Sequence, residues 1–159
     1  MIKKTAVIFE SFEGKIRPPS WEALTCAVEL SNGDTDEIQL ILLGEKLEAL
    51  AQEISEKGGR NVIAIETGNG GFYNSARYKS ILTGLFREQG VTHICLAGTT
   101  QGLDYAPGLA IRMDAACLTG VEGVFDAGDR LGYVRSIHGG KIVERLSVAA
   151  PLTVIVTQP

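Results

Sequence analysis

The chain has 159 residues, of which 45% are hydrophobic and 21% are charged, and its formal net charge at pH 7 is −4. This length predicts one compact domain spanning residues 1–159, and the acidic balance lacks the basic footprint of nucleic-acid-binding proteins. Its apolar runs are all shorter than the ~18 residues of a membrane helix, and the N-terminus lacks a signal-peptide cleavage site, so we expect a soluble, cytoplasmic protein with no membrane partner.

An apolar run followed by a helical repeat opens the chain. Residues 5–10 have a strand pattern, and the loop over residues 11–19 contains a glycine and paired prolines that oppose regular structure. Ser20 is placed to cap the next helix, and Gly33 to end it. We expect the buried face of that helix to consist of Trp21, Leu24, Val28 and Leu30.

Two further strand patterns and a second helix follow. Residues 37–43 form a near-continuous apolar run, typical of a strand covered on both faces, and residues 46–57 repeat apolar residues at helical spacing. The strand over residues 61–66 leads into a glycine-rich loop at 67–72. Because residue 73 is Tyr, this loop lacks the third glycine of a dinucleotide-binding fingerprint, and we interpret it as a plain turn.

A third helix is predicted to begin after Asn74 as its cap and to end at Gly90. Its apolar face is expected to contain Tyr78, Ile81, Leu82, Leu85 and Phe86. Residues 92–97 then form another strand pattern. Repeated alternation of strand and helix predicts a mainly parallel sheet with helices on both faces, which is a three-layer α/β/α fold.

The loop over residues 98–104 lies between that strand and a fourth helix. Asp104 is expected to cap this helix, with Pro107 in its first turn. Its apolar face is expected at Leu109, Met113 and Ala116. A strand that feeds a helix through such a loop is where α/β folds bind ligands, because the amides at the helix start face the loop.

Beyond Cys117 the pattern changes to strands without intervening helices. Four strand-like runs cover residues 121–125, 131–137, 142–149 and 152–157. The Gly-Gly sequence after His138 suits a two-residue hairpin turn, because glycine accepts positive backbone angles. We therefore expect this region to be antiparallel, at least in part.

Residues that commonly carry catalysis are sparse in this chain. The two histidines, His93 and His138, fall at a strand start and in a turn, and we assign them structural or surface roles. Glu10, Glu13 and Asp104 lie on predicted loops at the carboxyl ends of strands and could meet in space, although carboxylates in such loops more often cap helices.

The cysteines, Cys26, Cys95 and Cys117, lie far apart in apolar surroundings and lack the spacing of a metal site, so we expect buried thiols and no bound metal. Reasoning from the residues alone thus reaches an α/β domain with a candidate anion or nucleotide site at residues 98–104. Its candidate contacts are Thr99, Thr100, Gly102 and Asp104.

The run from Gly98 to Ala110, Gly-Thr-Thr-Gln-Gly-Leu-Asp-Tyr-Ala-Pro-Gly-Leu-Ala, resembles the N-terminal domain of the alpha (large) subunit of electron-transfer flavoproteins. Further agreement, in the family's order, occurs at Glu10, residues 14–15, Glu22, Ala27, residues 133–135, residues 139–140 and residues 151–159. The chain departs from the family pattern at three positions. It has Leu103 and Gly108 where the family commonly has arginine, and Gly120 where the family usually has aspartate. The resemblance implies a domain related to adenine nucleotide alpha hydrolase-like folds.

The resemblance also implies a function without catalytic residues. In the family a C-terminal domain mainly holds the flavin adenine dinucleotide (FAD), and Pro159 falls about where the connection to that domain would begin. We therefore expect no cofactor in this chain and FAD in the parent complex. The chain would be a scaffold that holds the beta subunit and helps to seat the flavin-binding domain, while electrons pass from a dehydrogenase to an acceptor.

Two expectations complete this interpretation. The alternative function is a stand-alone adenine-nucleotide-binding module that uses the loop from Thr99 to Asp104. The predicted hairpin from Leu131 to Ala149 is expected at the contact with the beta subunit, and the isolated domain is expected to self-associate through it.

Overall fold

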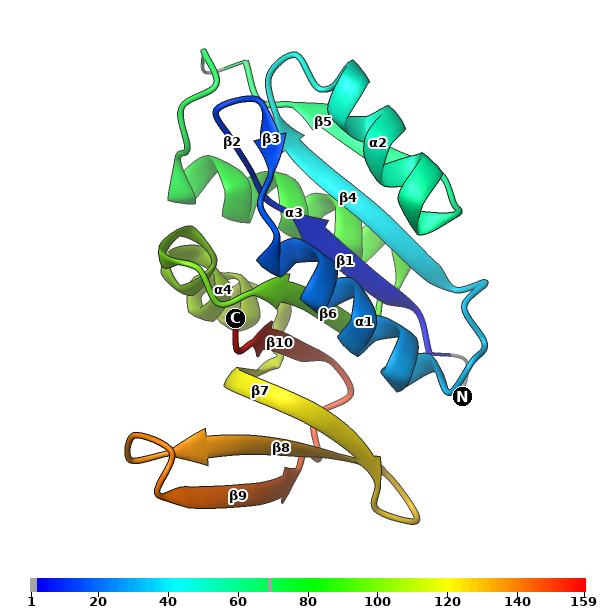
Figure 1. Ribbon diagram of the computed structural model, residues 1–159, viewed down its shortest axis with the longest axis vertical. Coiled ribbons are helices and arrows are strands. Elements are labelled where there is room, and N and C mark those ends of the chain that lie inside the picture. Colours follow the sequence, from blue (N-terminus) through cyan, green and yellow to red (C-terminus); the bar gives the residue numbers. More distant parts are fainter. Residues whose placement is uncertain (1–2, 69) are drawn as a thin grey trace.

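The computed structural model describes residues 3–68 and 70–159 and has helices on both faces of one large sheet (Figure 1). Met1 and Ile2, in the N-terminus considered above, and Asn69, in the glycine-rich loop, lie outside the described residues. The strands are β1 (Thr5–Phe9), β2 (Ser11–Phe12), β3 (Lys15–Ile16), β4 (Ile38–Gly44), β5 (Val62–Glu66), β6 (His93–Ala97), β7 (Ala116–Asp126), β8 (Leu131–Ile137), β9 (Ile142–Ser147) and β10 (Thr153–Thr157). The helices are α1 (Pro19–Ser31), α2 (Glu48–Gly58), α3 (Ser75–Gln89) and α4 (Thr100–Met113).

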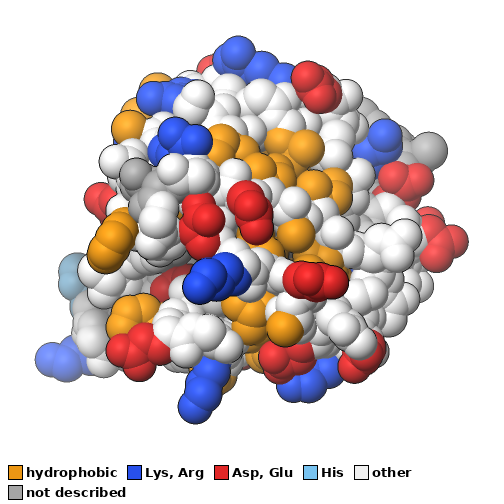
Figure 2. All heavy atoms as spheres, turned by 90° about the horizontal axis from the view of Figure 1, so that it is seen from above, with side chains coloured by type: hydrophobic (Ala, Val, Ile, Leu, Met, Phe, Trp, Pro, Cys, Tyr) orange, Lys and Arg blue, Asp and Glu red, His pale blue; other side chains and the backbone are white. Residues whose placement is uncertain are grey.

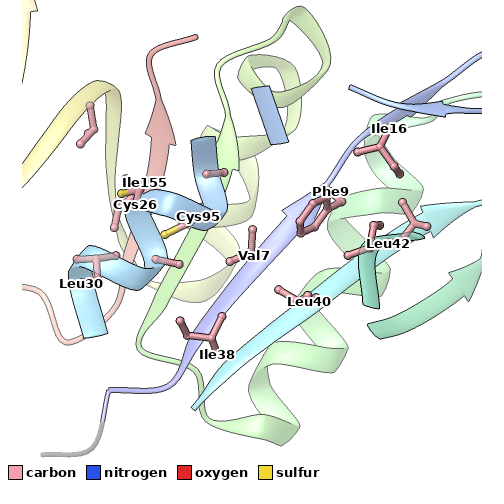
Figure 3. Packing of buried hydrophobic residues seen from close by; sticks show 14 of the residues in the cluster. Val7, Phe9, Ile16, Cys26, Leu30, Ile38, Leu40, Leu42, Cys95 and Ile155 are labelled. Carbon is pink, nitrogen blue, oxygen red and sulfur yellow. The ribbon is translucent and has the colours of Figure 1, made fainter. Parts of the chain in front are cut away.

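The main sheet has eight strands in the order β5-β4-β1-β6-β10-β7-β8-β9. Pairings from β5 to β7 are parallel, and those from β7 to β9 are antiparallel. Helices α1 and α2 pack on one face, whose core surrounds Val7 and Leu40, while α3 and α4 pack on the other around Ile8 and Leu96. The predicted three-layer, mainly parallel fold is confirmed, and Figure 3 shows the core beneath α1.

The strands at the centre of the sheet are mostly apolar because both of their faces are covered. All five residues of β1 are buried, as are Leu40 to Leu43 in β4. At the β5 edge the residues are only half-buried or exposed. Figure 2 looks onto this end of the molecule and shows hydrophobic side chains gathered at its middle, bordered by charged ones.

The start and the buried face of α1 differ from expectation. Pro18 occupies the cap position, and Ser20 is instead buried inside the first turn, where its Oγ accepts a hydrogen bond from the Glu10 amide at 2.9 Å. Val28, predicted to be buried, is 37% exposed, whereas Ala23 and Ala27 are fully buried. Small side chains let this helix lie close to the sheet, so the buried face follows the alanines rather than the largest apolar residues.

The loop over residues 11–19 contains a regular element that the prolines had argued against. Ser11 and Phe12 pair with Lys15 and Ile16 as a short antiparallel hairpin. Its two turn residues, Glu13 and Gly14, both have positive φ, at 48° and 73°. This is the backbone of a two-residue primed turn, which suits the twist of paired strands, and the prolines lie beyond it.

Strand β7 extends further toward the N-terminus than expected and joins the two parts of the sheet. Residues 116–121 pair in parallel with β10, and residues 121–126 pair antiparallel with β8. Gly120 lies at this junction with φ of 68°, next to a register irregularity between Val121 and Gly123. Ala116 therefore begins a strand, and not the end of a helical face as predicted, because α4 ends at Met113.

Strand β10 is the main surprise in the topology. It was predicted among antiparallel runs, yet it lies parallel between β6 and β7, with all five residues buried. The β8–β9 hairpin is confirmed, but four residues connect its strands where a two-residue turn was predicted. Strand β9 ends at Ser147, two residues before the predicted limit. Among the described residues, each helix is too short or too polar to cross a membrane.

Candidate functional site

The start of α4 lies earlier than the sequence pattern predicted. Thr99 is the cap, and its Oγ1 accepts a hydrogen bond from the Gly102 amide at 3.0 Å. Asp104 therefore lies within the helix and does not cap it, and Pro107 also lies inside the helix, not in its first turn. Most of the predicted loop at residues 98–104 is thus the first turn of α4, and a side chain already bonds one of its free amides.

The two glycines of this segment serve close packing. A Cβ on Gly98 would lie 2.5 Å from the Thr157 carbonyl oxygen, and one on Gly102 would lie 2.1 Å from the Ala97 carbonyl oxygen. Both positions exclude any side chain because α4 begins directly against the ends of β6 and β10. The space that such glycines open to a phosphate in a nucleotide-binding loop is occupied here by the protein's own backbone.

Glu10 and Thr99 meet at the carboxyl edge of the sheet. The Thr99 hydroxyl donates a hydrogen bond to the Glu10 carboxylate, so this hydroxyl is donor and acceptor at once. The backbone of Glu10 is fixed as well, since its carbonyl accepts from the Arg17 amide at 2.8 Å. The pair ties the end of β1 to the start of α4.

The three carboxylates that could have met in space, Glu10, Glu13 and Asp104, do not form one cluster. Asp104 bonds to a different partner, because its Oδ2 accepts a hydrogen bond from the Tyr73 hydroxyl at 2.6 Å. Glu13 lies exposed in the β2–β3 turn. Acid–base catalysis by a carboxylate pair therefore has no geometric basis among these three residues.

Tyr73, Tyr78 and Tyr105 form a cluster that was not predicted from the sequence. The ring centroids of Tyr73 and Tyr78 are 4.9 Å apart, and those of Tyr78 and Tyr105 are 5.5 Å apart. Burial raises the pKa of all three hydroxyls, with further contributions from Asp104 at Tyr73 and from Glu10 at Tyr78. The rings stay protonated at neutral pH, so they supply hydrogen-bond donors and packing and no general base.

The charge at the start of α4 is unfavourable to phosphate. Residues 98–106 contain no lysine or arginine, whereas Glu10 and Asp104 place two carboxylates beside the helix start. Thr100 and Asp104 are exposed, and Gly102 is buried. With no cation, no open glycine cradle and one amide already bonded, these residues do not fit a nucleotide or the pyrophosphate of FAD.

The cysteines are only partly as predicted. Cys26 on α1 and Cys95 on β6 are buried and lie close together in Figure 3. The neighbouring Cys26 thiol and burial hold the pKa of Cys95 well above its usual range. Cys117 is half-buried and not fully enclosed. Burial also raises the pKa of Cys117, and raised pKa values keep the Cys95 and Cys117 thiols in their less reactive neutral form.

Comparison with known proteins gives a consistent family match. The family model for the electron transfer flavoprotein domain matches residues 5–159. The electron transfer flavoprotein subunit alpha of Bacillus subtilis is 26% identical over 159 residues, which are 100% of this chain and 48% of that protein. The corresponding subunit of Megasphaera elsdenii is 29% identical over 142 residues, 88% of this chain and 42% of that protein.

A third relative has the same description. The electron transfer flavoprotein subunit alpha of Syntrophomonas wolfei is 26% identical over 145 residues, covering 91% of this chain and 44% of that protein. The chain thus spans less than half the length of each of these relatives.

Proposed function

The chain belongs to the electron transfer flavoprotein domain family, and from this membership we propose that it is the scaffold and subunit-association domain of an alpha subunit. It supports flavin-mediated electron transfer from a dehydrogenase to an acceptor in the cytoplasm. Residues 1–159 form one domain that is part of an electron carrier and catalyses no step itself. FAD belongs to the parent complex, not to this chain.

The filled carboxyl edge of the sheet is the observation that carries this proposal. At the place where an α/β fold would bind a ligand, Gly98 and Gly102 are packed against backbone, and Thr99 bonds to Glu10. Residues 98–106 contain no lysine or arginine that could pair with a phosphate. A site closed by its own residues supports a structural role for this domain.

We place the contact with the beta subunit on the β8–β9 hairpin, residues 131–149. Figure 1 shows this hairpin extending from the layered part of the molecule. Strand β9 is an edge strand, and Ile142 and Val143 on it are 50% and 63% exposed. Adjacent residues of a strand point to opposite faces, so each face of this edge carries an exposed apolar side chain, which favours coverage by a partner or by a second copy.

We place the seat of the flavin-binding domain on the carboxyl edge of the sheet. Phe12, Phe72 and Leu103 follow β1, β5 and β6 and are 59%, 78% and 46% exposed. Carboxyl ends of parallel strands meet at one edge, so these three side chains share it. Pro159 lies at the same edge, since its Cδ would be 3.3 Å from a Cβ on Gly98.

Reconstitution tests the proposal. The chain is purified alone and then mixed with a beta subunit and the flavin-binding domain of an alpha subunit from the same family. We expect a colourless chain when alone and a stable complex that carries FAD when all parts are present. A yellow preparation of the chain alone, with one flavin per chain, would overturn the scaffold proposal.

A further inference from the structure

A cavity lies at the amino edge of the sheet, where β6 and β10 begin, at the opposite edge from the start of α4. Its volume is about 500 Å³, which is within the range of small-molecule sites. His93 and Thr153, at the first positions of these two strands, line it from the sheet. Leu131 and Tyr133 on β8, with Val148 to Pro151, form its apolar side. None of these residues belongs to the proposed flavin seat.

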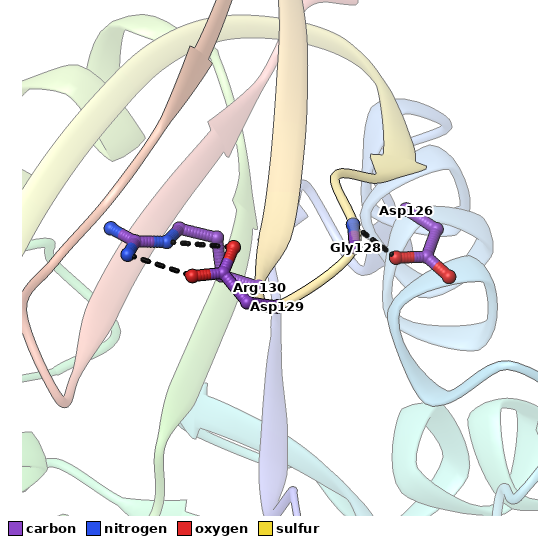
Figure 4. Close-up of polar contacts among 4 residues, drawn as sticks. All are labelled: Asp126, Gly128, Asp129 and Arg130. Atoms are coloured by element: carbon purple, nitrogen blue, oxygen red, sulfur yellow. Dashed lines mark hydrogen bonds and ion pairs between the residues drawn. The ribbon is translucent and has the colours of Figure 1, made fainter.

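The charged groups that line this cavity are cationic. Lys3 and Arg130 are both present, and its described lining residues include no aspartate or glutamate. The Lys3 ammonium donates to the Leu30 carbonyl at 3.3 Å, and Arg130 pairs with Asp129 at 3.0 Å (Figure 4). Asp129 has a side chain that is 74% exposed, so the pair is weak, and an anion in the cavity can compete for the guanidinium.

His93 offers the cavity a hydrogen-bond acceptor. The Thr92 hydroxyl donates to the Lys4 carbonyl at 3.2 Å and lies 2.9 Å from Nδ1 of His93, and from this arrangement we assign the ring proton to Nδ1. Burial and the charge of Lys3 lower the pKa of His93 to about 4, which keeps the ring neutral at pH 7. With its proton on Nδ1, the ring presents Nε2 as an acceptor, and none of the described residues donates to it.

Polar side chains form a row beneath the cavity. Thr5, His93 and Thr153 are register partners on three adjacent parallel strands, so their side chains lie on the same face of the sheet. The Tyr133 hydroxyl is in hydrogen-bonding contact with Thr153. The Thr5 hydroxyl is buried and has no hydrogen-bond partner among the described residues. A buried polar row with spare donors and acceptors is unusual for a purely structural core.

We propose that this cavity binds a small hydroxy-substituted organic carboxylate, whose carboxylate faces Lys3 and Arg130 and whose hydroxyl donates to Nε2 of His93. The apolar body of the ligand packs against Leu131 and Val148. Each part of the ligand matches a separate feature of the lining: charge to the cations, a donor to the imidazole, and carbon surface to the aliphatic side chains. Leu131 and Val148 also lie within residues 131–149, so this site borders the proposed contact with the beta subunit.

The test uses the three isomers of hydroxybenzoate as probes, with benzoate and inorganic phosphate as comparators. Nitrogen NMR of the His93 ring reports contact, and calorimetry gives the affinity. We expect at least one isomer to bind with a Kd below roughly 1 mM, to perturb Nε2, and to bind at least about fivefold more tightly than benzoate. Absence of any perturbation of His93 at roughly 10 mM of each isomer would overturn the proposal.

Substitutions of single arginines distinguish specific binding in the cavity from adventitious anion binding. Arg130→Gln should weaken binding of the best isomer about tenfold, whereas Arg77→Gln, in the first turn of α3 at the carboxyl edge, should leave its Kd within about twofold. Phosphate that binds as well as the best isomer, with no effect of Arg130→Gln, would mean an adventitious ion only and would contradict the proposal. Comparison of hydroxybenzoate with benzoate on the unsubstituted chain tests the His93 contact without a variant that unfolds.

Discussion

The Thr99 hydroxyl donates to the Glu10 carboxylate while it accepts from the Gly102 amide. One side chain thus caps α4 and fixes that helix to the end of β1. These two elements are 89 residues apart at this contact, so a local capping interaction and a long-range one depend on the same oxygen.

Loss of the Thr99 hydroxyl should therefore destabilise the fold more than loss of an ordinary exposed hydroxyl. Thr99→Ala is expected to lower the free energy of unfolding by about 1–2 kcal/mol, because the Gly102 amide loses its acceptor. Thr99→Ser keeps the oxygen and should lose less than about 0.5 kcal/mol. Thr100→Ala, at the exposed neighbouring position, is the matched control in urea unfolding. Equal effects of the two alanine variants would contradict this role.

Two helical glycines should respond in opposite directions to alanine. Gly102→Ala places a Cβ against the Ala97 carbonyl and is expected to destabilise by more than about 2 kcal/mol, since backbone must move. Gly84→Ala, in the middle of α3 with nothing within 4 Å of the new Cβ, should stabilise by roughly 0.5–1 kcal/mol. Thermal unfolding of both variants checks the pair. A stable Gly102→Ala variant would show that α4 is free to shift from the strand ends.

Adenine nucleotides should bind weakly to the carboxyl edge. The helix start has one amide bonded by Thr99, and Glu10 and Asp104 oppose an added anion. Calorimetry with AMP and ATP is expected to show no site with a Kd at or below about 1 μM. A site of that affinity that disappears in a Thr100→Glu variant would favour the nucleotide-module alternative instead.

Charged substitutions on the β8–β9 hairpin should weaken subunit association. Val134 pairs with Arg145, and Ile142 pairs with Ile137, which places Val134 and Ile142 on opposite faces of the hairpin. We expect Val134→Glu or Ile142→Glu to weaken binding of the beta subunit, or self-association of the isolated chain, roughly tenfold or more. Whichever variant weakens association identifies the face of the hairpin that contacts the partner.

Ala64→Glu is the control for that experiment, because Ala64 is exposed on β5 at the other edge of the sheet. Light scattering coupled to gel filtration measures association, and circular dichroism confirms that each variant folds. Unchanged association in both hairpin variants would mean that the hairpin is not the interface. An effect confined to Ala64→Glu would move the interface to the β5 edge.

The free energy of unfolding should decrease as the pH falls from about 6.5 to about 4, because His93 stays neutral over this range in the folded chain. Its folded pKa of about 4 lies below the ordinary value of 6.5, so the unfolded chain binds the proton more readily between these values. The contribution of neutral His93 is complete above about pH 6.5 and is lost toward pH 4, amounting to about 3 kcal/mol. Urea unfolding at several pH values measures it.

His93→Gln should flatten that part of the stability profile because no imidazole remains to be protonated there. His138→Asn, which leaves His93 in place and suits the positive φ of that turn residue, should keep the slope. An unchanged slope in His93→Gln would assign the pH dependence to other groups.

Local signals predicted α3 well because its ends are set by its own sequence. Asn74 accepts a hydrogen bond from the Arg77 amide at 2.9 Å, and Gly90 takes the left-handed conformation, as expected of a cap and a stop. At α4 the predicted cap was Asp104, whereas the structure has Thr99. The Glu10 carboxylate selects Thr99, and sequence spacing carries no sign of a partner so distant along the chain.

The position of β10 in the sheet could not be predicted from local sequence patterns either. A short apolar run is compatible with an edge strand or a central one, and here pairing with β6 and β7 decided it. The tyrosine cluster was missed for a related reason. Tyr78 belonged to a predicted apolar face, but Tyr73 and Tyr105 come from different segments and meet only after α3 and α4 pack together.

The central position of β10 also bears on how the domain is made. During synthesis, β6 and β7 leave the ribosome before the strand that separates them, so each presents an unpaired edge until Thr153–Thr157 emerges. The nascent chain therefore cannot complete its sheet before almost all of the domain has been translated. Pairing over such long sequence separations slows folding, and this interval is when the chain is most exposed to wrong pairing or capture by chaperones.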